Sequence, residues 1–274
     1  MAGRNAAGND AAGNEGDRGS LTVLGCDGSY PGPGGACSGY LVRGGGATVW
    51  LDAGAGTFAA LQLVADPRTV DAVVLSHEHP DHWIDVDSFA AWRRGAGCGR
   101  PVAVYAPPGL RNRSYFGGDP TLAWHQVEPS WRVAVRGVEA PATGGGSGLL
   151  LSFCATDHGP PTLGVRIEHA AGDRSAGLAA LGYTADTGPD WSAEELGPGI
   201  GLLLCEATYT SEHEGEGRHL SGRQAGGLAA AAGVGRLVLT HRRPSTDAAA
   251  LEAEAATEFG APVEQAAVNR VFLW

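Results

Sequence analysis

Short apolar runs alternate with stretches of helical spacing along most of this chain of 274 residues. The apolar runs are rich in Val and Leu and are bounded by Gly, Pro or Asp, which is typical of buried strands. The strands predicted from these runs are 21–26, 36–42, 48–52, 71–75, 102–105, 131–138, 149–154, 162–167, a run that ends at Asp186, 202–206, 236–241 and a closing strand over 263–274.

Helices are predicted between several of these strands. Apolar side chains recur at roughly helical spacing over 83–94, and a further short helix is predicted over 57–64. A Gly- and Ala-rich segment that ends at Ala232 indicates a close-packed helix, and 246–259 has the pattern of an amphipathic helix. Strands that alternate with helices predict an α/β fold, an αββα sandwich of two stacked mixed sheets with outer helices.

No stretch has the composition of a linker, so we predict a single domain over 21–274 after a disordered leader over 1–20. The leader contains Gly, Ala, Asn and acidic residues without an apolar core, which is not the pattern of a signal peptide. Residues 110–131 carry four aromatic side chains and are predicted to be irregular, either as a wall of a substrate site or as surface packing.

The formal charge is −11, and the basic side chains are all arginines because the chain contains no lysine. This composition excludes a lysine nucleophile and argues against a large nucleic-acid partner, whose phosphates basic side chains must neutralise. A small anionic substrate remains compatible, because bound metal ions can supply positive charge. No apolar run approaches the ~20 residues that span a membrane. Five scattered cysteines favour reduced thiols in the cytoplasm over a disulfide framework.

Residues 76–85, Ser-His-Glu-His-Pro-Asp-His-Trp-Ile-Asp, hold the densest group of metal-binding side chains. Three imidazoles and a carboxylate lie within six positions, between a predicted strand and a predicted helix: His77, His79, Asp81 and His82. Alternation along an extended segment places His77 and His79 on one face, and Pro80 ends that segment. Imidazole and carboxylate are ligands of zinc and similar ions, so the pattern predicts two metals, one for each pair.

Acids or histidines also follow other predicted strands. These residues are Asp52, His158, Asp186, Glu206 and His241. Taken alone, each is compatible with an ordinary turn or structural residue, although a carboxylate such as Asp186 can also bridge two cations with its two oxygens. Arg242 and Arg243 follow the last of these strands and could contact a phosphate, although the favoured interpretation is an exposed pair.

The H-x-H-x-D-H pattern at a strand end resembles the metal-binding motif of the metallo-β-lactamase fold superfamily. Further motifs resemble its ribonuclease Z-like branch: T-V-L-G-C from residue 22, G-Y-T-A-D-T-G at 182–188, L-C-E-A-T at 204–208, H-L-S-G at 219–222 and L-T-H at 239–241. Within this branch the chain is most similar to the short class II cyclic nucleotide phosphodiesterases. The resemblance covers nearly the whole chain from residue 21 onward.

This resemblance implies a complete site for two divalent metal ions, foremost zinc, with manganese or iron as alternatives. It assigns His77, His79 and His158 to one ion, Asp81, His82 and His241 to the other, and Asp186 to both. It also implies that Asp81 orients the attacking water and that His219, oriented by Glu206, protonates the leaving group. Asp52 would support the metal-binding histidines, although it fits a strand-end turn equally well.

The leading hypothesis is therefore a dimetal hydrolase that cleaves a small phosphodiester, such as a 3′,5′-cyclic nucleotide, with metal-bound hydroxide. One alternative is a dimetal hydrolase of an ester, thioester or lactone, because the same metals activate water for attack on a carbonyl. Another is a non-catalytic metal-binding scaffold. Ribonuclease Z carries a long basic arm for tRNA between the positions of His158 and Asp186. Here the centre of 159–185 is rich in Ala and Gly and barely charged, which argues against tRNA processing. The sequence leaves the oligomeric state open, with a homodimer as a candidate.

Overall fold

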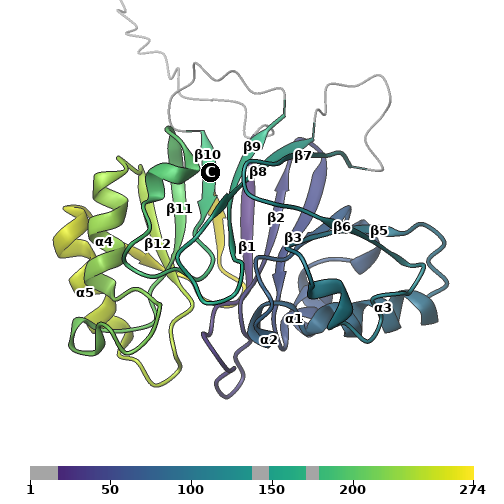
Figure 1. Ribbon diagram of the computed structural model, residues 1–274, viewed down its shortest axis with the longest axis horizontal. Helices are drawn as coiled ribbons and strands as arrows, with labels where there is room; N and C mark the ends of the chain where they lie inside the picture. The colour runs from purple at the N-terminus through teal and green to yellow at the C-terminus, as the bar shows by residue number, and fades with distance from the viewer. Residues whose placement is uncertain (1–17, 138–147, 171–178) are drawn as a thin grey trace, which may run out of the picture.

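The computed structural model describes residues 18–137, 148–170 and 179–274. In this part of the chain, two seven-stranded sheets stack between helices (Figure 1). The predicted αββα sandwich is therefore confirmed. Most of the predicted leader, up to position 17, lies outside the described residues, and the first strand begins at Ser20.

The first sheet contains the strands of the N-terminal half together with the last strand of the chain, in the order β14-β1-β2-β3-β4-β5-β6. Pairing is antiparallel from β14 to β3 and parallel from β3 to β6. The strands are β1 (Ser20–Gly25), β2 (Gly39–Gly44), β3 (Ala47–Ala53), β4 (Ala72–Val74), β5 (Val102–Ala106), β6 (Leu122–Gln126) and β14 (Val271–Leu273).

The second sheet has the order β13-β12-β11-β10-β9-β8-β7. Pairing is antiparallel from β7 to β10 and parallel from β10 to β13. The strands are β7 (Arg132–Val135), β8 (Leu149–Ala155), β9 (Leu163–His169), β10 (Ala180–Tyr183), β11 (Ile200–Glu206), β12 (Arg236–Thr240) and β13 (Glu264–Gln265).

The main hydrophobic core lies between the two sheets. Leu51 of β3, Val165 of β9 and Leu204 of β11 are fully buried there. Side chains alternate along a strand, so Leu203 of β11 points the other way and packs under the helices. Because both faces of β11 are covered, its sequence is apolar almost throughout.

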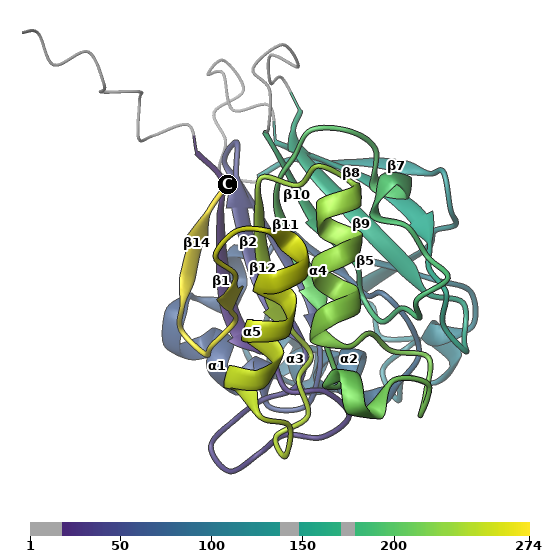
Figure 2. The same cartoon turned by 90° about the vertical axis from the view of Figure 1, so that its left-hand side faces the viewer.

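Helices cover the outer face of each sheet (Figures 1 and 2). They are α1 (Thr57–Val64), α2 (Pro80–Trp83) and α3 (Asp85–Gly95) on the first sheet, and α4 (Gly222–Ala231) and α5 (Ala248–Phe259) on the second. Glycines let α4 and α5 approach closely, since a Cβ at Gly226 would lie 2.3 Å from the carbonyl oxygen of Ala255. The Gly- and Ala-rich segment is thus a close-packed helix, as predicted.

Two predictions about segments are wrong. Residues 110–131 are not irregular throughout, because β6 lies within them and extends the first sheet beside β5. Residues 263–274 do not form one strand, because β13 joins the second sheet and β14 joins the first. An apolar pattern does not reveal such a crossing between sheets. Within the described residues, no helix combines the length and apolar character needed to span a membrane.

Candidate metal centre

The loop after β4 positions the densest group of predicted ligands. Its extended part carries His77 and His79 to the start of α2, where Pro80 occupies the first helical position. A proline costs no helical hydrogen bond at that position. The loop lies close to β3 because the neighbouring residue is a glycine: a Cβ at Gly54 would be 2.0 Å from the carbonyl oxygen of Asp81.

Two groups of side chains bring their ligand atoms together at this end of the sandwich. Within each group, these atoms lie no more than 4.8 Å from one another. The groups are His77, His79, His158 and Asp186, and Asp81, His82 and His241; a third, overlapping set of Asp186, His219 and His241 also lies within this distance. The structure therefore brings together all the residues that the sequence analysis assigned to metal ions.

Asp186 lies between the imidazoles of the first group and those of the second, and each of its two carboxylate oxygens faces one of these sets. Oδ2 is 3.6 Å from Nε2 of His77 and 3.8 Å from Nε2 of His158. Oδ1 is 3.2 Å from Nε2 of His82 and 3.4 Å from Nε2 of His241. A carboxylate in this position can give one oxygen to each of two cations.

Four of the histidines are oriented by a hydrogen bond from Nδ1, which leaves Nε2 toward the centre of the cluster. The acceptors are Oγ of Ser76 for His77 (3.0 Å), Oδ2 of Asp52 for His82 (2.7 Å), the carbonyl oxygen of Arg218 for His158 (3.1 Å) and Oγ1 of Thr208 for His241 (2.9 Å). Metal-binding histidines usually have such a partner, because it fixes the tautomer and the ring orientation.

Unpaired buried atoms also indicate that the predicted ligands, together called the cluster, could hold a pair of divalent cations. Nε2 of His77, Nε2 of His82 and Oδ1 of Asp186 are buried and make no well-aligned hydrogen bond among the described residues, although the last two atoms are 3.2 Å apart. Buried polar atoms in proteins are nearly always paired. These three face one another, so cations bound between them would satisfy all of them.

Electrostatics favours ligand-competent forms of His77, His158 and Asp186. Burial lowers the pKa of His77 well below its ordinary value and also lowers the pKa of His158, so both rings are neutral near pH 7. Burial alone would raise the pKa of Asp186, but the positive charges of His241 and His82 bring it well below its usual range. Asp186 is therefore a carboxylate. Burial would lower the pKa of His82, but the carboxylates of Asp186 and Asp52 raise it well above its usual range in the metal-free protein.

Strained backbone is concentrated at this site. Non-glycine residues with a left-handed φ are uncommon and cost of order 1–3 kcal/mol each, and they cluster at functional sites. Four described non-glycine residues with a left-handed φ belong to the cluster, contact it or directly precede one of its members. They are Ser29 (φ 66°), Asp52 (φ 52°), Ala185 (φ 51°) and His241 (φ 55°). Ser29 belongs to this set because its N–H donates to Oδ2 of Asp81 at 2.7 Å.

His219 lies beside the predicted metal ligands. Its ring stacks on His241 with centroids 5.3 Å apart, and its Nδ1 donates to Oε1 of Glu206 at 2.9 Å. Glu206 is fully buried and also accepts from the N–H of Thr187 and the hydroxyl of Thr208. Burial would lower the pKa of His219, but the charge and hydrogen bond of Glu206 raise it to about 9.

Several supporting residues were not singled out by the sequence analysis. Tyr183 donates its hydroxyl hydrogen to Oδ2 of Asp52 at 2.7 Å, and the hydroxyl of Ser76 donates to the same oxygen at 2.8 Å. Thr208 connects His241 to Glu206. Each belongs to a quoted motif or follows a strand, but only the fold shows which partner it meets.

Arg242 and Arg243 are half-buried, so their interpretation as an exposed pair is wrong. Nη1 of Arg242 donates to the carbonyl oxygens of Arg243 and Thr246, which holds the loop after β12 in place. The guanidinium of Arg243 lies 4.8 Å from the ring centre of Tyr209 and donates to its hydroxyl at 3.2 Å.

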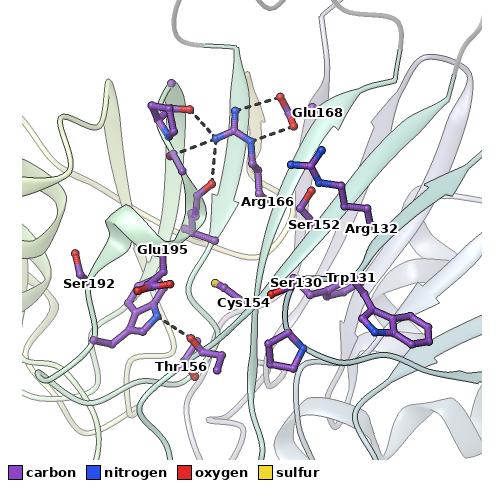
Figure 3. A pocket seen from close by; sticks show the side chains of 18 of the residues that line it. Ser130, Trp131, Arg132, Ser152, Cys154, Thr156, Arg166, Glu168, Ser192 and Glu195 are labelled. Atoms are coloured by element: carbon purple, nitrogen blue, oxygen red, sulfur yellow. Dashed lines mark hydrogen bonds and ion pairs between the residues drawn. The ribbon is translucent and has the colours of Figure 1, made fainter.

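A cavity of about 1100 Å³ lies elsewhere, on the outer face of β8 and β9. Cys154 stands in the middle of this cavity, and Arg166 above it is held by Glu168 and by loop carbonyl oxygens (Figure 3). Burial raises the pKa of Cys154 to about 12, so the thiol is not a nucleophile near pH 7. None of the predicted metal ligands lines this cavity.

Comparison with known proteins gives the family. The model of the family described as Beta-lactamase superfamily domain matches residues 37–242 of this chain. An uncharacterised protein of Mycobacterium tuberculosis is 35% identical over 262 residues, which cover 92% of this chain and 91% of that protein. Ribonuclease Z of Kineococcus radiotolerans is 32% identical over 284 residues, covering 86% of this chain and 88% of that protein. The chain belongs to the β-lactamase superfamily, and the predicted resemblance is confirmed.

Solved structures share the fold. The metallo-β-lactamase fold protein YhfI of Bacillus subtilis matches with a TM-score of 0.78 at 24% identity, covering 94% of this chain and 100% of that one. Yeast PDE1 matches with a TM-score of 0.69 at 12% identity, covering 94% and 99%. A comparison of sequences also matches YhfI, which is named a probable metallo-hydrolase. It is 27% identical over 226 residues, covering 81% of this chain and 86% of that protein. These relatives confirm the predicted class, a metal-dependent hydrolase.

Proposed function

We propose that this protein is a dimetal hydrolase of small phosphodiesters, with a 3′,5′-cyclic nucleotide as the candidate substrate. The observation that carries the proposal is the position of Asp186, whose two oxygens face two separate groups of imidazoles. A structural zinc site needs only four ligands and no such bridge. Zinc is the metal proposed first, with manganese or iron as alternatives for the same donor set.

Two divalent ions held there would lower the pKa of a water molecule and offset the negative charge that grows on a phosphoryl group. The chain's own contribution is to fix the ligands and to orient the reactants. Asp81 is held by the N–H of Ser29 and lies 3.3 Å from Nε2 of His241. We assign it the role of orienting the attacking water.

His219 is the proposed proton donor to the leaving alkoxide. Its Nδ1 is bonded to Glu206, so Nε2 is the nitrogen that remains available to the substrate. The alkoxide of a phosphodiester is a poor leaving group, and protonation by a positioned side chain typically accelerates such steps by 10²–10⁴-fold. Glu206 does not touch the reacting atoms in this scheme; it positions His219.

Charge favours a small substrate over RNA. The chain has a formal charge of −11 and no lysine, whereas binding to a polyanion depends on many basic contacts. Ribonuclease Z is the name of a relative, and its substrate is not transferred to this chain. All five cysteines are free, which agrees with the proposed cytoplasmic location.

The proposal is tested with purified, zinc-loaded protein and a panel of 3′,5′-cyclic AMP, bis(p-nitrophenyl) phosphate and p-nitrophenyl acetate. We expect phosphodiester turnover that disappears on chelation and in Asp81→Ala, and that falls at least 100-fold in His219→Asn. His125→Asn is the control, because His125 is exposed on β6 and stacks on Tyr105.

Each alternative has its own result in the same panel. If only the acyl ester is hydrolysed, the protein is a hydrolase of carbonyl substrates and not of phosphodiesters. No turnover and no bound metal in a folded sample would indicate a scaffold. Phosphodiesterase activity that survives both chelation and Asp81→Ala would refute the dimetal mechanism. Light scattering on the same sample decides whether the protein is the candidate homodimer.

A further inference from the structure

A second cavity, of about 590 Å³, lies one side chain away from His219, which does not itself line it. Tyr209 lines it, and the centre of the Tyr209 ring lies 5.9 Å from that of His219. Ligand pockets commonly have volumes of roughly 300–1000 Å³, so this cavity can hold a group the size of a nucleoside.

Arg243 forms a flat, fixed surface in this cavity. The carbon of its guanidinium lies over the Tyr209 ring, 4.8 Å from the ring centre, and Nη2 donates to the tyrosine hydroxyl. The guanidinium makes no ion pair with a carboxylate among the described residues. The nearby carboxylate of Glu254 is occupied instead by the N–H and hydroxyl of Ser211. One face of the guanidinium is thus backed by an aromatic ring. A guanidinium plane is a common stacking partner of a nucleobase.

The charge of the cavity selects against a second phosphate. Among the described residues, the cavity is lined by one arginine, Arg243, and by four acids, Glu212, Glu216, Asp247 and Glu254. A phosphorylated leaving group would meet excess negative charge there. An uncharged group with N–H donors would find acceptors, and the exocyclic amino group of a nucleobase is such a donor.

We propose that this cavity binds the nucleobase of the substrate, stacked on Arg243 with its amino group toward the carboxylates. The inference rests on the proposed function, because His219 as proton donor places the leaving oxygen, and the sugar that bears it, on the Tyr209 side of the site. It narrows the substrate to a nucleoside phosphodiester without a further phosphate. Arg243 is then a specificity-determining residue that does not touch the reacting atoms.

The test compares 3′,5′-cyclic AMP with the base-free 1-O-methylribose 3′,5′-cyclic phosphate. The ratio of their kcat/KM values measures what the base contributes. Loss of base stacking typically weakens binding by one to two orders of magnitude, so we expect this ratio to fall roughly tenfold or more in Arg243→Ala. Arg243→Lys keeps the charge but not the plane, and it should behave like the alanine variant. Arg132→Ala, an exposed arginine on β7, should leave the ratio unchanged.

Other outcomes overturn the inference. An equal loss on both substrates, or rescue by lysine, would mean that Arg243 acts through charge or through the fold. Adenosine binding to the metal-free protein, followed by calorimetry, separates this inference from the proposed function because no chemistry is involved. Binding that is lost in Arg243→Ala supports the site even if no phosphodiester is turned over. Absence of adenosine binding in the wild-type protein refutes it even if turnover occurs.

Discussion

Oδ2 of Asp52 lies 2.7 Å from Nδ1 of His82, and both side chains are completely buried. The same oxygen accepts the hydroxyl of Ser76, whose own oxygen accepts from Nδ1 of His77. One carboxylate therefore orients an imidazole from each of the two predicted ligand groups. It also accepts from Tyr183 in the other sheet, so the orientation of the ligands is tied to the packing of the sandwich.

Substitution of Asp52 by asparagine should cost both stability and metal affinity. An amide cannot accept all the hydrogen bonds of the carboxylate, and a buried donor left without a partner costs about 1–3 kcal/mol. We expect the free energy of unfolding of the metal-free protein to fall by about 2–4 kcal/mol, and zinc affinity to fall by about 10- to 100-fold. Urea denaturation and a competition titration with a chromogenic chelator measure the two effects.

Tyr183→Phe gives a graded comparison for the same network. It removes one donor and keeps the ring, so a loss of about 1 kcal/mol is expected. If Asp52→Asn unfolded at the same urea concentration as the wild type, the carboxylate would not be holding the two sheets and the ligands together.

The bridging position of Asp186 predicts a change in metal content. A catalytic pair of ions gives about two per chain, and Asp186→Asn should retain one at most, because an amide has a single good ligand oxygen. Asp190→Asn is the matched control, since Asp190 is exposed on the same loop. Elemental analysis of both variants after dialysis decides the point. Two retained ions in Asp186→Asn would remove the bridge from the scheme.

Much of the site is encoded in short-range patterns, and this part could be predicted. Residues 77–82 need only a strand end and a helix start to bring their ligands together, and the spacing of the histidines shows this directly. His158, Asp186 and His241 stand at unremarkable strand ends. Their assignment depended on the resemblance to a family, because nothing local shows that three distant segments meet.

The resemblance implied supporting roles for Asp52 and Glu206, but most of the other supporting contacts could not be predicted, for a physical reason. Tyr183 and Asp52 are 131 positions apart and meet because two sheets stack in one register. The prediction of a single strand over 263–274 was wrong for a similar reason. Apolar alternation shows that one face of a strand is buried, but not which sheet buries it. The half-buried state of Arg243 depends on a tyrosine that is 34 positions away.

Glu206 should control the protonation of His219. In the metal-free protein, Glu206 counteracts the effect of burial and raises the pKa of His219 to about 9. Glu206→Gln removes that charge, so the pKa should fall toward the ordinary value of about 6.5. Imidazole NMR titration measures it. Glu216→Gln serves as the control, because Glu216 bonds the exposed His213.

The same shift has a consequence for stability. Because the pKa is raised in the folded state, protonated His219 stabilises the metal-free fold fully below about pH 6.5, and this contribution disappears as the pH rises through about 9. Between pH 6 and pH 9.5, unfolding free energy should therefore fall more in the wild type than in Glu206→Gln. Parallel curves would show that the two side chains are not coupled.

Gly54 should be indispensable for the shape of the loop that carries His77 to His82. A methyl group there would lie 2.0 Å from the carbonyl oxygen of Asp81, so either β3 or the loop must move. We expect Gly54→Ala to lose more than about 2 kcal/mol of stability and to bind zinc more weakly, since Asp81 and His82 move with the loop. Gly227→Ala is the matched control: it lies inside α4 with nothing within 4 Å of the added Cβ, and it should gain about 0.5–1 kcal/mol. Wild-type zinc affinity in a folded Gly54→Ala protein would show that the loop has another way to hold its ligands, and that the close contact with β3 is incidental to the metal centre.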